Sequence, residues 1–377
     1  MADQKKSRSN KDPEGLSAFI EREAGKGGGD DLPADVEILK NEIRRLRKQL
    51  RVGSGKEELI VQTVRDHLEN NQPNLKPIKM PSRDRRSKDP EIAVLHYSDA
   101  QFGKITSSYD SAVGLARAEK LAQKTVQITE IRRSSYPIRE LRLYIGGDIV
   151  EGESIFPGQP FLIDNPLIEQ ACNVAPTAIA RMVRYFLEHY EKVRVICVPG
   201  NHGRNSKFAD PRTNWDMVAC RVAKEMLTNT DGKLLPRLEF EVPGSFYVVD
   251  RVFNWGNLVV HGDQIRGGFA GFPWYGVGKK ASGWADTIKE PWDYLWFGHF
   301  HTMASGTLNH RQFLGNGTTE SDNEYALEQL AAAGHPVQRL AFFSAQHGLI
   351  SDNPVWLTDE RCSQAQLWSK WTNRGKR

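Results

Sequence analysis

The sequence predicts an α/β fold, in which short buried strands alternate with helices. Five apolar runs rich in Val, Ile, Leu, Tyr or Trp end on polar residues: IAVLHYSDAQ (92–101), LRLYIGGD (141–148), VRVICVPGNH (193–202), NLVVHGD (257–263) and DYLWFGHFH (293–301). Apolar runs of this length, bounded by turn residues, are typical of buried strands. With 377 residues the chain can bury a full α/β core and still carry an additional module.

Helices are predicted between these strands, over residues 111–131, 167–190 and 213–227. The second of them carries an apolar stripe suited to a core, formed by Ile168, Val174, Ile179, Met182, Val183 and Phe186. Helices at these intervals between strands fit the layering of α/β proteins.

Five segments are expected along the chain. They are a disordered polar tail at 1–34, a helical extension at 35–72, a basic Pro-containing linker at 73–90, the main domain at 91–351, and a basic tail with tryptophans at 352–377. The tail at 1–34 is too polar to form a packed core.

A short helix is expected at 35–51. Its apolar residues Leu39, Ile43, Leu46 and Leu50 are spaced as two heptads, which are marginal alone. The helix is therefore expected to pack on the core, on another copy of the chain or on a partner. Its basic face either contacts a nucleic-acid backbone or is a solvated helix face.

Composition excludes some classes of protein. No run approaches the ~18–20 apolar residues that a membrane span requires, and the first residues lack the apolar stretch of a signal peptide. The four cysteines are widely spaced, so we expect reduced thiols in a cytoplasmic protein. The formal net charge of +4 comes from the first 90 residues, and the rest of the chain has no net charge. Overall charge therefore does not indicate nucleic-acid binding by the main domain, which would depend on local basic patches.

Metal-type ligands follow the five predicted strands. They are Asp99, Gln101, Asp148, Asn201, His202, His261, Asp263, His299 and His301. Side chains at successive strand ends converge on one edge of a sheet, and mixed oxygen and imidazole donors suit divalent ions. The pattern therefore predicts a two-metal centre. His96, in contrast, lies inside a predicted strand and is expected to be packed.

The motifs closely resemble those of the calcineurin-like metallophosphoesterase superfamily, whose signature is D-x-H, GD, GNH, H and GHxH. The resemblance covers residues 91–346. It implies a β-sandwich of mixed sheets flanked by helices, preceded here by the N-terminal helical extension. The phrases GGDIVEGE, FPGQ and VPGNHGR look most like phage-encoded, DNA-processing members, which would place the protein in a host cytoplasm.

The resemblance also implies roles for the motif residues. Asp148 would bridge two divalent ions. One ion would take Asp99, Gln101 and His301, and the other would take Asn201, His261 and His299. His202 would not bind metal but would face the scissile phosphate as a general acid or charge stabiliser.

Gln101 departs from the family pattern, which has His at this position. An amide oxygen is a harder and weaker donor than imidazole, so it favours Mn²⁺ or Mg²⁺ over Zn²⁺. We expect Mn²⁺ as the ion, and a first metal that is either loosely held or bound only when substrate is present.

Four residues are candidates for binding substrate. Arg204 and Arg266 are each expected either to bind phosphate or to be ordinary exposed arginines. The segment 267–284 is expected to be a loop, in which Trp274 and Tyr275 either stack on nucleobases or pack on the surface. Asp263 either orients a metal ligand or caps a turn. Glu151 and Glu153 either approach the metals or face solvent, and we expect them to face solvent.

The expected function is hydrolysis of phosphodiesters by a divalent-metal-dependent enzyme, with DNA as the substrate. Two alternatives remain open. The same metals serve a phosphomonoesterase acting on protein or a small molecule. A non-catalytic scaffold would bind nucleic acid or a partner without turnover.

Overall fold

The computed structural model describes residues 78–205, 213–229, 232–267, 272–322 and 335–358. The chain divides into two compact units, Met1–Thr63 and Val64–Arg377, and the described residues all belong to the second. The expected polar tail, the extension at 35–72 with its helix at 35–51, and the end of the C-terminal tail lie outside the described residues.

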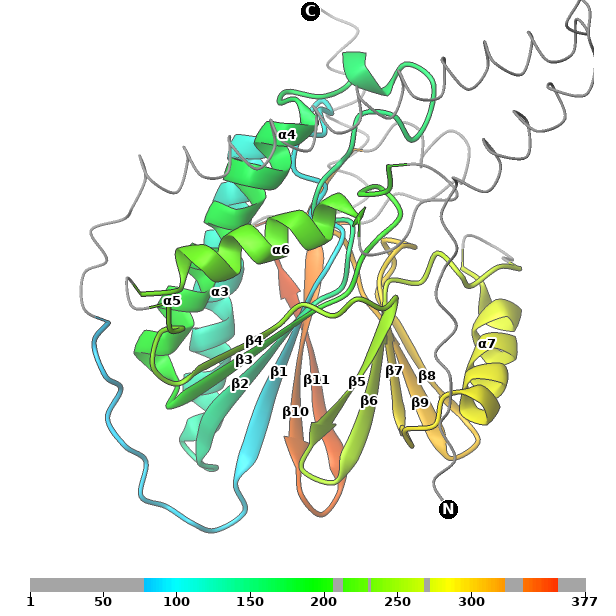
Figure 1. Ribbon diagram of the computed structural model, residues 1–377. Helices are drawn as coiled ribbons and strands as arrows, with labels where there is room; N and C mark the ends of the chain where they lie inside the picture. The colour runs from blue at the N-terminus through cyan, green and yellow to red at the C-terminus, as the bar shows by residue number, and fades with distance from the viewer. Residues whose placement is uncertain (1–77, 206–212, 230–231, 268–271, 323–334, 359–377) are drawn as a thin grey trace, which may run out of the picture. The chain divides into compact units, whose positions relative to one another are not determined.

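The first sheet has six strands, in the order β11-β10-β1-β2-β3-β4 (Figure 1). They are β1 (Glu91–Tyr97), β2 (Ile138–Ile145), β3 (Lys192–Cys197), β4 (Leu238–Glu241), β10 (Val337–Ser344) and β11 (Gly348–Trp356). Strands β1 to β4 are parallel, and β10 and β11 are antiparallel to their neighbours. Every residue of β1 is buried, as expected for a strand covered on both faces.

Three helices cover one face of this sheet: α3 (Ser111–Arg133), α5 (Ala175–His189) and α6 (Trp215–Met226) (Figure 1). The one-turn helix α4 (Leu167–Glu169) and a π-helical segment (Gln170–Val174) lead into α5. The Asp110 side chain caps α3 by accepting from the Val113 amide at 2.8 Å. The predicted helices at 111–131, 167–190 and 213–227 are therefore confirmed, and their apolar faces form the largest core cluster with the sheet.

The second sheet has the order β5-β6-β7-β9-β8 and mixes parallel and antiparallel pairs. Its strands are β5 (Tyr247–Val252), β6 (Trp255–Val260), β7 (Tyr294–Phe297), β8 (Ala304–Leu308) and β9 (Arg311–Gly315). Helix α7 (Trp274–Thr287) lies against the outer face of this sheet (Figure 1) and buries Val277, Ala281 and Trp284 there.

A second apolar cluster joins the two sheets. It takes Val94, Tyr144 and Ile196 from the first sheet and meets Val259 and Trp296 from the second. Helices, sheet, sheet and helix thus form four layers, and the expected sandwich of mixed sheets flanked by helices is confirmed.

Two segments differ from the expectation. Residues 274–287 form α7 rather than a loop, because the apolar Val277, Ala281 and Trp284 recur at helical spacing and pack on the sheet. Strand β11 crosses the boundary expected at 351, because residues 352–356 pair with β10 and bury Val355. The first residues of the expected tail therefore belong to the main domain.

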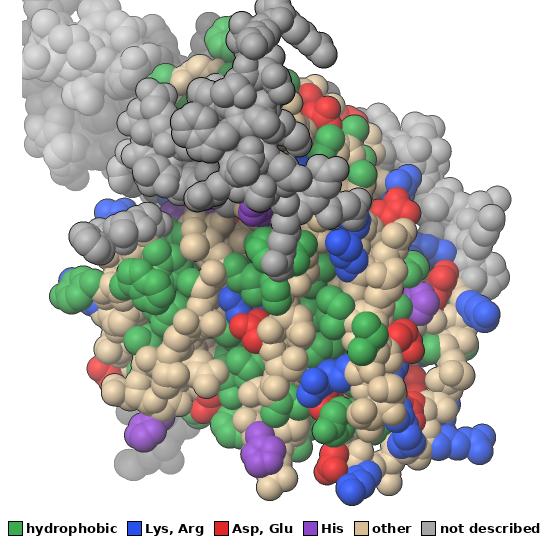
Figure 2. Space-filling model, turned by 180° about the vertical axis from the view of Figure 1, so that it is seen from behind, with side chains coloured by type: hydrophobic (Ala, Val, Ile, Leu, Met, Phe, Trp, Pro, Cys, Tyr) green, Lys and Arg blue, Asp and Glu red, His purple; other side chains and the backbone are tan. Residues whose placement is uncertain are grey.

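No helix among the described residues has the length and apolar character that a membrane crossing requires. Figure 2 shows one face of the molecule, on which the described Lys and Arg side chains are interspersed with Asp and Glu. The three cysteines in the described part of the chain, Cys172, Cys197 and Cys220, are buried and form no disulfide.

His96 is packed between the sheets, as expected, with its ring against Trp296 at a centroid distance of 5.7 Å. Burial lowers the pKa of His96 to about 3, while an unfolded His titrates near 6.5. The unfolded state therefore gains a proton below pH 6.5 that the folded state does not accept until pH 3. Folding stability from this group is intact above pH 6.5 and falls as the pH drops.

We expect His96 to cost about 2 kcal/mol of unfolding free energy between pH 6.5 and pH 5, at about 1.4 kcal/mol per pH unit. The measurement is urea unfolding of wild type and His96→Leu at several pH values. The variant should lose less stability on acidification, because the other titrating groups are shared. Equal acid slopes in the two proteins would contradict the assignment.

Candidate metal centre

The predicted ligands lie at the carboxyl ends of parallel strands. Asp99 and Gln101 follow β1, Asp148 follows β2, and Asn201 and His202 follow β3; His261 follows β6, and His299 and His301 follow β7. Within the second sheet, the Gly298 amide donates to the His261 carbonyl at 2.8 Å. The His299 amide donates to an Asp99 carboxylate oxygen at 3.0 Å and so ties a loop of the second sheet to a loop of the first. The loops of both sheets therefore meet at one edge of the sandwich.

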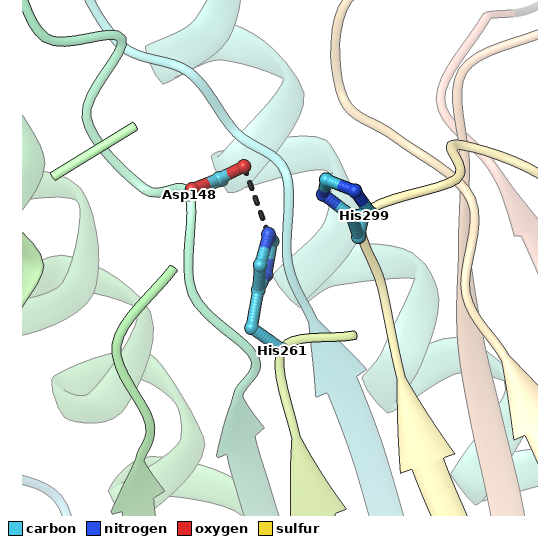
Figure 3. A group of neighbouring side chains, drawn as sticks. All are labelled: Asp148, His261 and His299. Atoms are coloured by element: carbon cyan, nitrogen blue, oxygen red, sulfur yellow. Dashed lines mark ion pairs between the residues drawn. The ribbon is translucent and has the colours of Figure 1, made fainter. Parts of the chain in front are cut away.

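Asp148, His261 and His299 form a compact ligand set, with their ligand atoms within 4.8 Å of one another. Figure 3 shows these three side chains pointing toward one another from three different strand ends. The shortest of these approaches joins Asp148 Oδ2 to His261 Nε2 at 2.9 Å. One carboxylate and two imidazoles are a donor set that suits a divalent transition metal.

The His261 ring is held in the orientation that a metal ligand needs. Its Nδ1 lies 2.8 Å from the Gly146 carbonyl oxygen, which can only accept, so Nδ1 carries a proton. Its Nε2 faces two acceptors, Asp148 Oδ2 and Asn201 Oδ1 at 3.2 Å. When only Nδ1 is protonated, Nε2 itself offers a lone pair and becomes the third acceptor atom of this group. Three acceptor atoms that converge in this way fit a cation.

The electrostatics of His261 agree with this geometry. Burial disfavours the charged ring, but the Asp148 carboxylate outweighs burial and raises the pKa of His261 to about 10. The neighbouring His299 behaves in the opposite way, because burial and the charge of His261 lower its pKa to about 4. The Asp148 carboxylate thus stabilises a positive charge at His261, and that charge in turn disfavours a second one on His299.

His301, a predicted ligand of the first metal, is also held by carboxylates. Its Nδ1 lies 2.7 Å from Glu320 Oε1, and its Nε2 lies 3.4 Å from Asp99 Oδ1. Burial opposes the charged form, but Glu320 and Asp99 raise the pKa of His301 to about 10. The sequence analysis missed Glu320, which orients His301 by the same kind of carboxylate contact that orients ligand histidines in metal sites.

The backbone of the motif loops is strained. Ten non-glycine residues of the described chain have positive φ, and five of them are predicted ligands: Asp99 (53°), Gln101 (47°), Asp148 (49°), His299 (68°) and His301 (51°). Each such conformation costs on the order of 1 kcal/mol and persists at functional sites where the surroundings enforce it. The concentration of backbone strain at these residues indicates that the sheet edge on which they lie is the functional site.

Asp216 holds the two motif loops that follow β2 and β3 by accepting hydrogen bonds from their backbone amides. This buried carboxylate accepts from the amides of Asp148 (2.9 Å), Ile149 (2.9 Å), Val150 (3.1 Å) and Gly200 (2.8 Å). Burial and the charge of Asp148 raise the pKa of Asp216 to about 6 despite these hydrogen bonds. The sequence analysis missed Asp216, which lies in the first turn of α6.

Asp216→Asn is expected to lower the unfolding free energy by about 3 kcal/mol, because the new NH₂ group faces amide donors and leaves buried groups unpaired. Urea unfolding at pH 7.5 measures the loss. Asp286→Asn, at an exposed position on α7, is the control and should change stability by less than about 0.5 kcal/mol. Equal stability of wild type and Asp216→Asn would contradict this role.

His202 is fixed beside the ligand set. Its amide donates to Asp148 Oδ1 at 2.7 Å, and its Nδ1 lies 2.9 Å from the Glu151 carbonyl oxygen and 3.2 Å from Glu151 Oε2. Burial opposes protonation, but Asp148 and Glu151 raise the pKa of His202 to about 9. The raised pKa favours the protonated ring at neutral pH, and Nε2, which lies 3.4 Å from Gln101 Nε2, is the ring nitrogen that Glu151 does not hold.

The expectation that Glu151 faces solvent is wrong. Glu151 is 2% exposed, because Gln159 donates to both its side chain (3.0 Å) and its carbonyl oxygen (2.8 Å) and so closes the loop over it. Glu153, in contrast, is exposed as expected and accepts from the Leu167 amide at 3.1 Å. Glu151 therefore positions His202 rather than meeting solvent.

Gln101 is buried at the same edge. Its Oε1 accepts from Lys104 Nζ at 2.9 Å, and its Nε2 lies 3.4 Å from His202 Nε2. Lys104 was not among the predicted site residues.

The four predicted substrate residues all reach solvent. Arg204 donates to the Asn201 carbonyl oxygen at 3.0 Å and lies 3.8 Å from Asp263 Oδ2, so Asp263 pairs with an arginine. Arg266 is exposed. Trp274 is 54% exposed and packs on Phe272, and Tyr275 is 74% exposed.

Comparisons with known proteins found similar solved structures at low sequence identity. No family model matches the chain, and no curated protein matches it. A predicted phosphoesterase from Streptococcus pneumoniae TIGR4 has 10% identity and a TM-score of 0.28, over 70% of this chain and 97% of its own. Wild-type Vps29 complexed with Zn²⁺ from Entamoeba histolytica has 12% identity and a TM-score of 0.30, over 71% and 99%. A novel archaeal phosphodiesterase has 8% identity and a TM-score of 0.32, over 70% and 98%.

Superpositions at these identities and TM-scores decide nothing about activity. The family likeness rests on the chain's own features: the motifs at five strand ends, their order, and the two mixed sheets between helices. In these features the chain resembles the calcineurin-like metallophosphoesterase superfamily, with Gln101 at the position where the family pattern has His.

Proposed function

We propose that this chain is a divalent-metal-dependent phosphoesterase that hydrolyses phosphodiesters, with DNA as its substrate and Mn²⁺ as its ion. The observation that carries the proposal is the convergence of Asp148, His261 and His299 within 4.8 Å, with Asn201 against His261. These residues would hold the ion together with Asp99 and His301. The bound metal would supply an activated water and Lewis acidity toward a phosphoryl oxygen.

The chain's own residues would perform the remaining tasks. His202, held by Glu151, is placed to donate a proton or to stabilise negative charge on the phosphate through Nε2. Asp216 holds the backbone amide of Asp148, and the amide of His202 holds its carboxylate. Preorganised contacts of this kind lower the barrier because they need not form during the reaction.

Three features support a nucleic-acid substrate. Arg204 lies next to the ligand Asn201, and a guanidinium suits phosphate oxygens. Trp274 and Tyr275 present exposed aromatic surface on which bases can stack. Arg266 is exposed on the loop that follows His261 and precedes α7. A chain of phosphodiesters offers both charges and bases to these groups.

The test is hydrolysis of bis(p-nitrophenyl) phosphate and p-nitrophenyl phosphate with Mn²⁺, Mg²⁺ or Zn²⁺. The proposal expects the larger kcat/KM for the diester, with Mn²⁺ as the best ion, and no turnover in EDTA. A preference for the monoester would instead indicate a phosphomonoesterase. The absence of turnover with every ion would indicate a non-catalytic binding protein.

A further inference from the structure

Lys104 is a cation built into one side of the metal centre. A turn brings its amide to the Gln101 carbonyl oxygen at 3.1 Å, and its ammonium returns to Gln101 Oε1 at 2.9 Å. The same ammonium forms an ion pair with Glu320, and its side chain is only 13% exposed. Lys104 is therefore held by two buried groups.

The contact with Lys104 settles which way the Gln101 amide points. An ammonium can only donate, so the Gln101 atom beside it must be the oxygen. The amide nitrogen then faces His202, and an NH₂ group offers no lone pair to a metal. Lys104 therefore competes with a metal for the Gln101 oxygen, the one atom of this side chain that could bind the metal.

Glu320 links this cation to the first metal position. One of its carboxylate oxygens orients His301, and the other pairs with Lys104. Only Glu320 separates the positive charge of Lys104 from the ligand His301. The charge of Lys104 would therefore repel a cation bound to His301. A divalent ion held by Asp99, His301 and the bridging Asp148 would meet this repulsion and would have to compete with Lys104 for the oxygen of Gln101.

The second metal position has a more complete set of donors. Asp148, His261 and His299 make up the single compact set of His, Cys, Asp and Glu ligands found in the described part of the chain. Asn201 adds an amide oxygen that faces His261. The two metal positions of the predicted centre are therefore unequal in their donors and in their surrounding charge.

We propose that Lys104 weakens the first metal position, so that the centre holds one divalent ion tightly and a second only at much higher metal concentration. The proposal rests on the metal centre proposed above and concerns the occupancy of its two positions. Neutralising Lys104 should tighten the second binding event at least about tenfold, the effect typical of residues that contact metal ligands.

The experiment is titration of the full-length, metal-free protein with MnCl₂, followed by isothermal titration calorimetry and by electron paramagnetic resonance. Wild type should bind one ion tightly and show the hyperfine pattern of an isolated Mn²⁺. Lys104→Met should bind two ions tightly and show a spin-coupled pair. Lys104→Arg, which keeps the charge, should resemble wild type, and so should Lys289→Met at an exposed lysine of the surface.

Lys104→Met leaves a buried carboxylate oxygen of Glu320 without its cation, so the double variant Lys104→Met/Glu320→Gln serves as a second test. It removes both charges and keeps an acceptor for His301, and it should also bind two ions tightly. Circular dichroism establishes that each variant is folded.

Two equally tight sites in wild type would overturn the role of Lys104 while leaving the phosphoesterase proposal intact. Unchanged binding in folded Lys104→Met and in the double variant would overturn it as well. If no variant bound Mn²⁺, the metal centre itself would be absent, and both proposals would fall.

Discussion

Asp148→Asn is expected to abolish tight metal binding and to lower kcat/KM for bis(p-nitrophenyl) phosphate by at least about 1,000-fold, since metal catalysis contributes several kcal/mol. Asp148 contributes the charge on which the ligand set converges, with His261 at 2.9 Å and the His202 amide at 2.7 Å. Those partners hold its pKa well below the usual range even though burial opposes ionisation. Asparagine keeps the shape of the side chain and removes the charge.

Calorimetric titration with MnCl₂ and steady-state kinetics measure the two effects. Asp286→Asn, the same substitution at an exposed residue, is the matched control and should leave both unchanged. Wild-type metal affinity in folded Asp148→Asn would show that Asp148 is not a ligand.

His202→Ala is expected to lower kcat by about 100-fold to 10,000-fold, the range for loss of a general acid or a charge stabiliser. Metal affinity should stay within about threefold of wild type, because the contact of residue 202 with Asp148 is made by its backbone amide and survives in alanine. The variant therefore separates proton donation from metal binding.

The measurements are kcat for bis(p-nitrophenyl) phosphate and the Mn²⁺ dissociation constant on the same preparations. Glu151→Gln should give an intermediate loss of kcat, since it keeps the contact from the Glu151 carbonyl oxygen and removes the charge beside Nδ1. Full activity in His202→Ala would contradict the role assigned to His202.

The strands and motifs were predictable because their signal is local. Each ligand directly follows an apolar run, and parallel strands bring their carboxyl ends together whatever the details of packing. The position of Asp148 after β2 and of His261 after β6 follows from that rule alone. The two-sheet sandwich could be predicted only from the family resemblance, because strands β4, β5 and β8 to β11 are not followed by a polar motif that would identify them in the sequence.

The residues that hold the ligands were not predictable in the same way. Glu320 and Asp216 lie far along the chain from the groups they bind, and Lys104 is an ordinary lysine until the turn returns it to Gln101. Glu151 was wrongly expected in solvent because nothing in its own motif shows that Gln159 closes over it. Such contacts depend on tertiary structure and leave no periodic pattern.

Glycine content explains the error at α7. Gly276, Gly278 and Gly283 made the segment resemble a loop, since glycine disfavours helices by about 1 kcal/mol per residue. Burial of Val277, Ala281 and Trp284 against the second sheet outweighs that preference. At Gly276 a side chain would also collide with the Arg266 carbonyl oxygen, at 2.2 Å from the position of a Cβ atom. The glycine there allows the helix to approach the loop that follows His261.

Cleavage of end-labelled single- and double-stranded DNA with MnCl₂, with wild type beside His202→Ala, tests the central claim most directly. The proposed function predicts that wild type shortens the DNA, that EDTA stops it, and that His202→Ala is at least about 100-fold slower. Intact DNA in every wild-type reaction, or equal cleavage by the two proteins, would contradict a metal-dependent DNA phosphodiesterase with His202 in its mechanism.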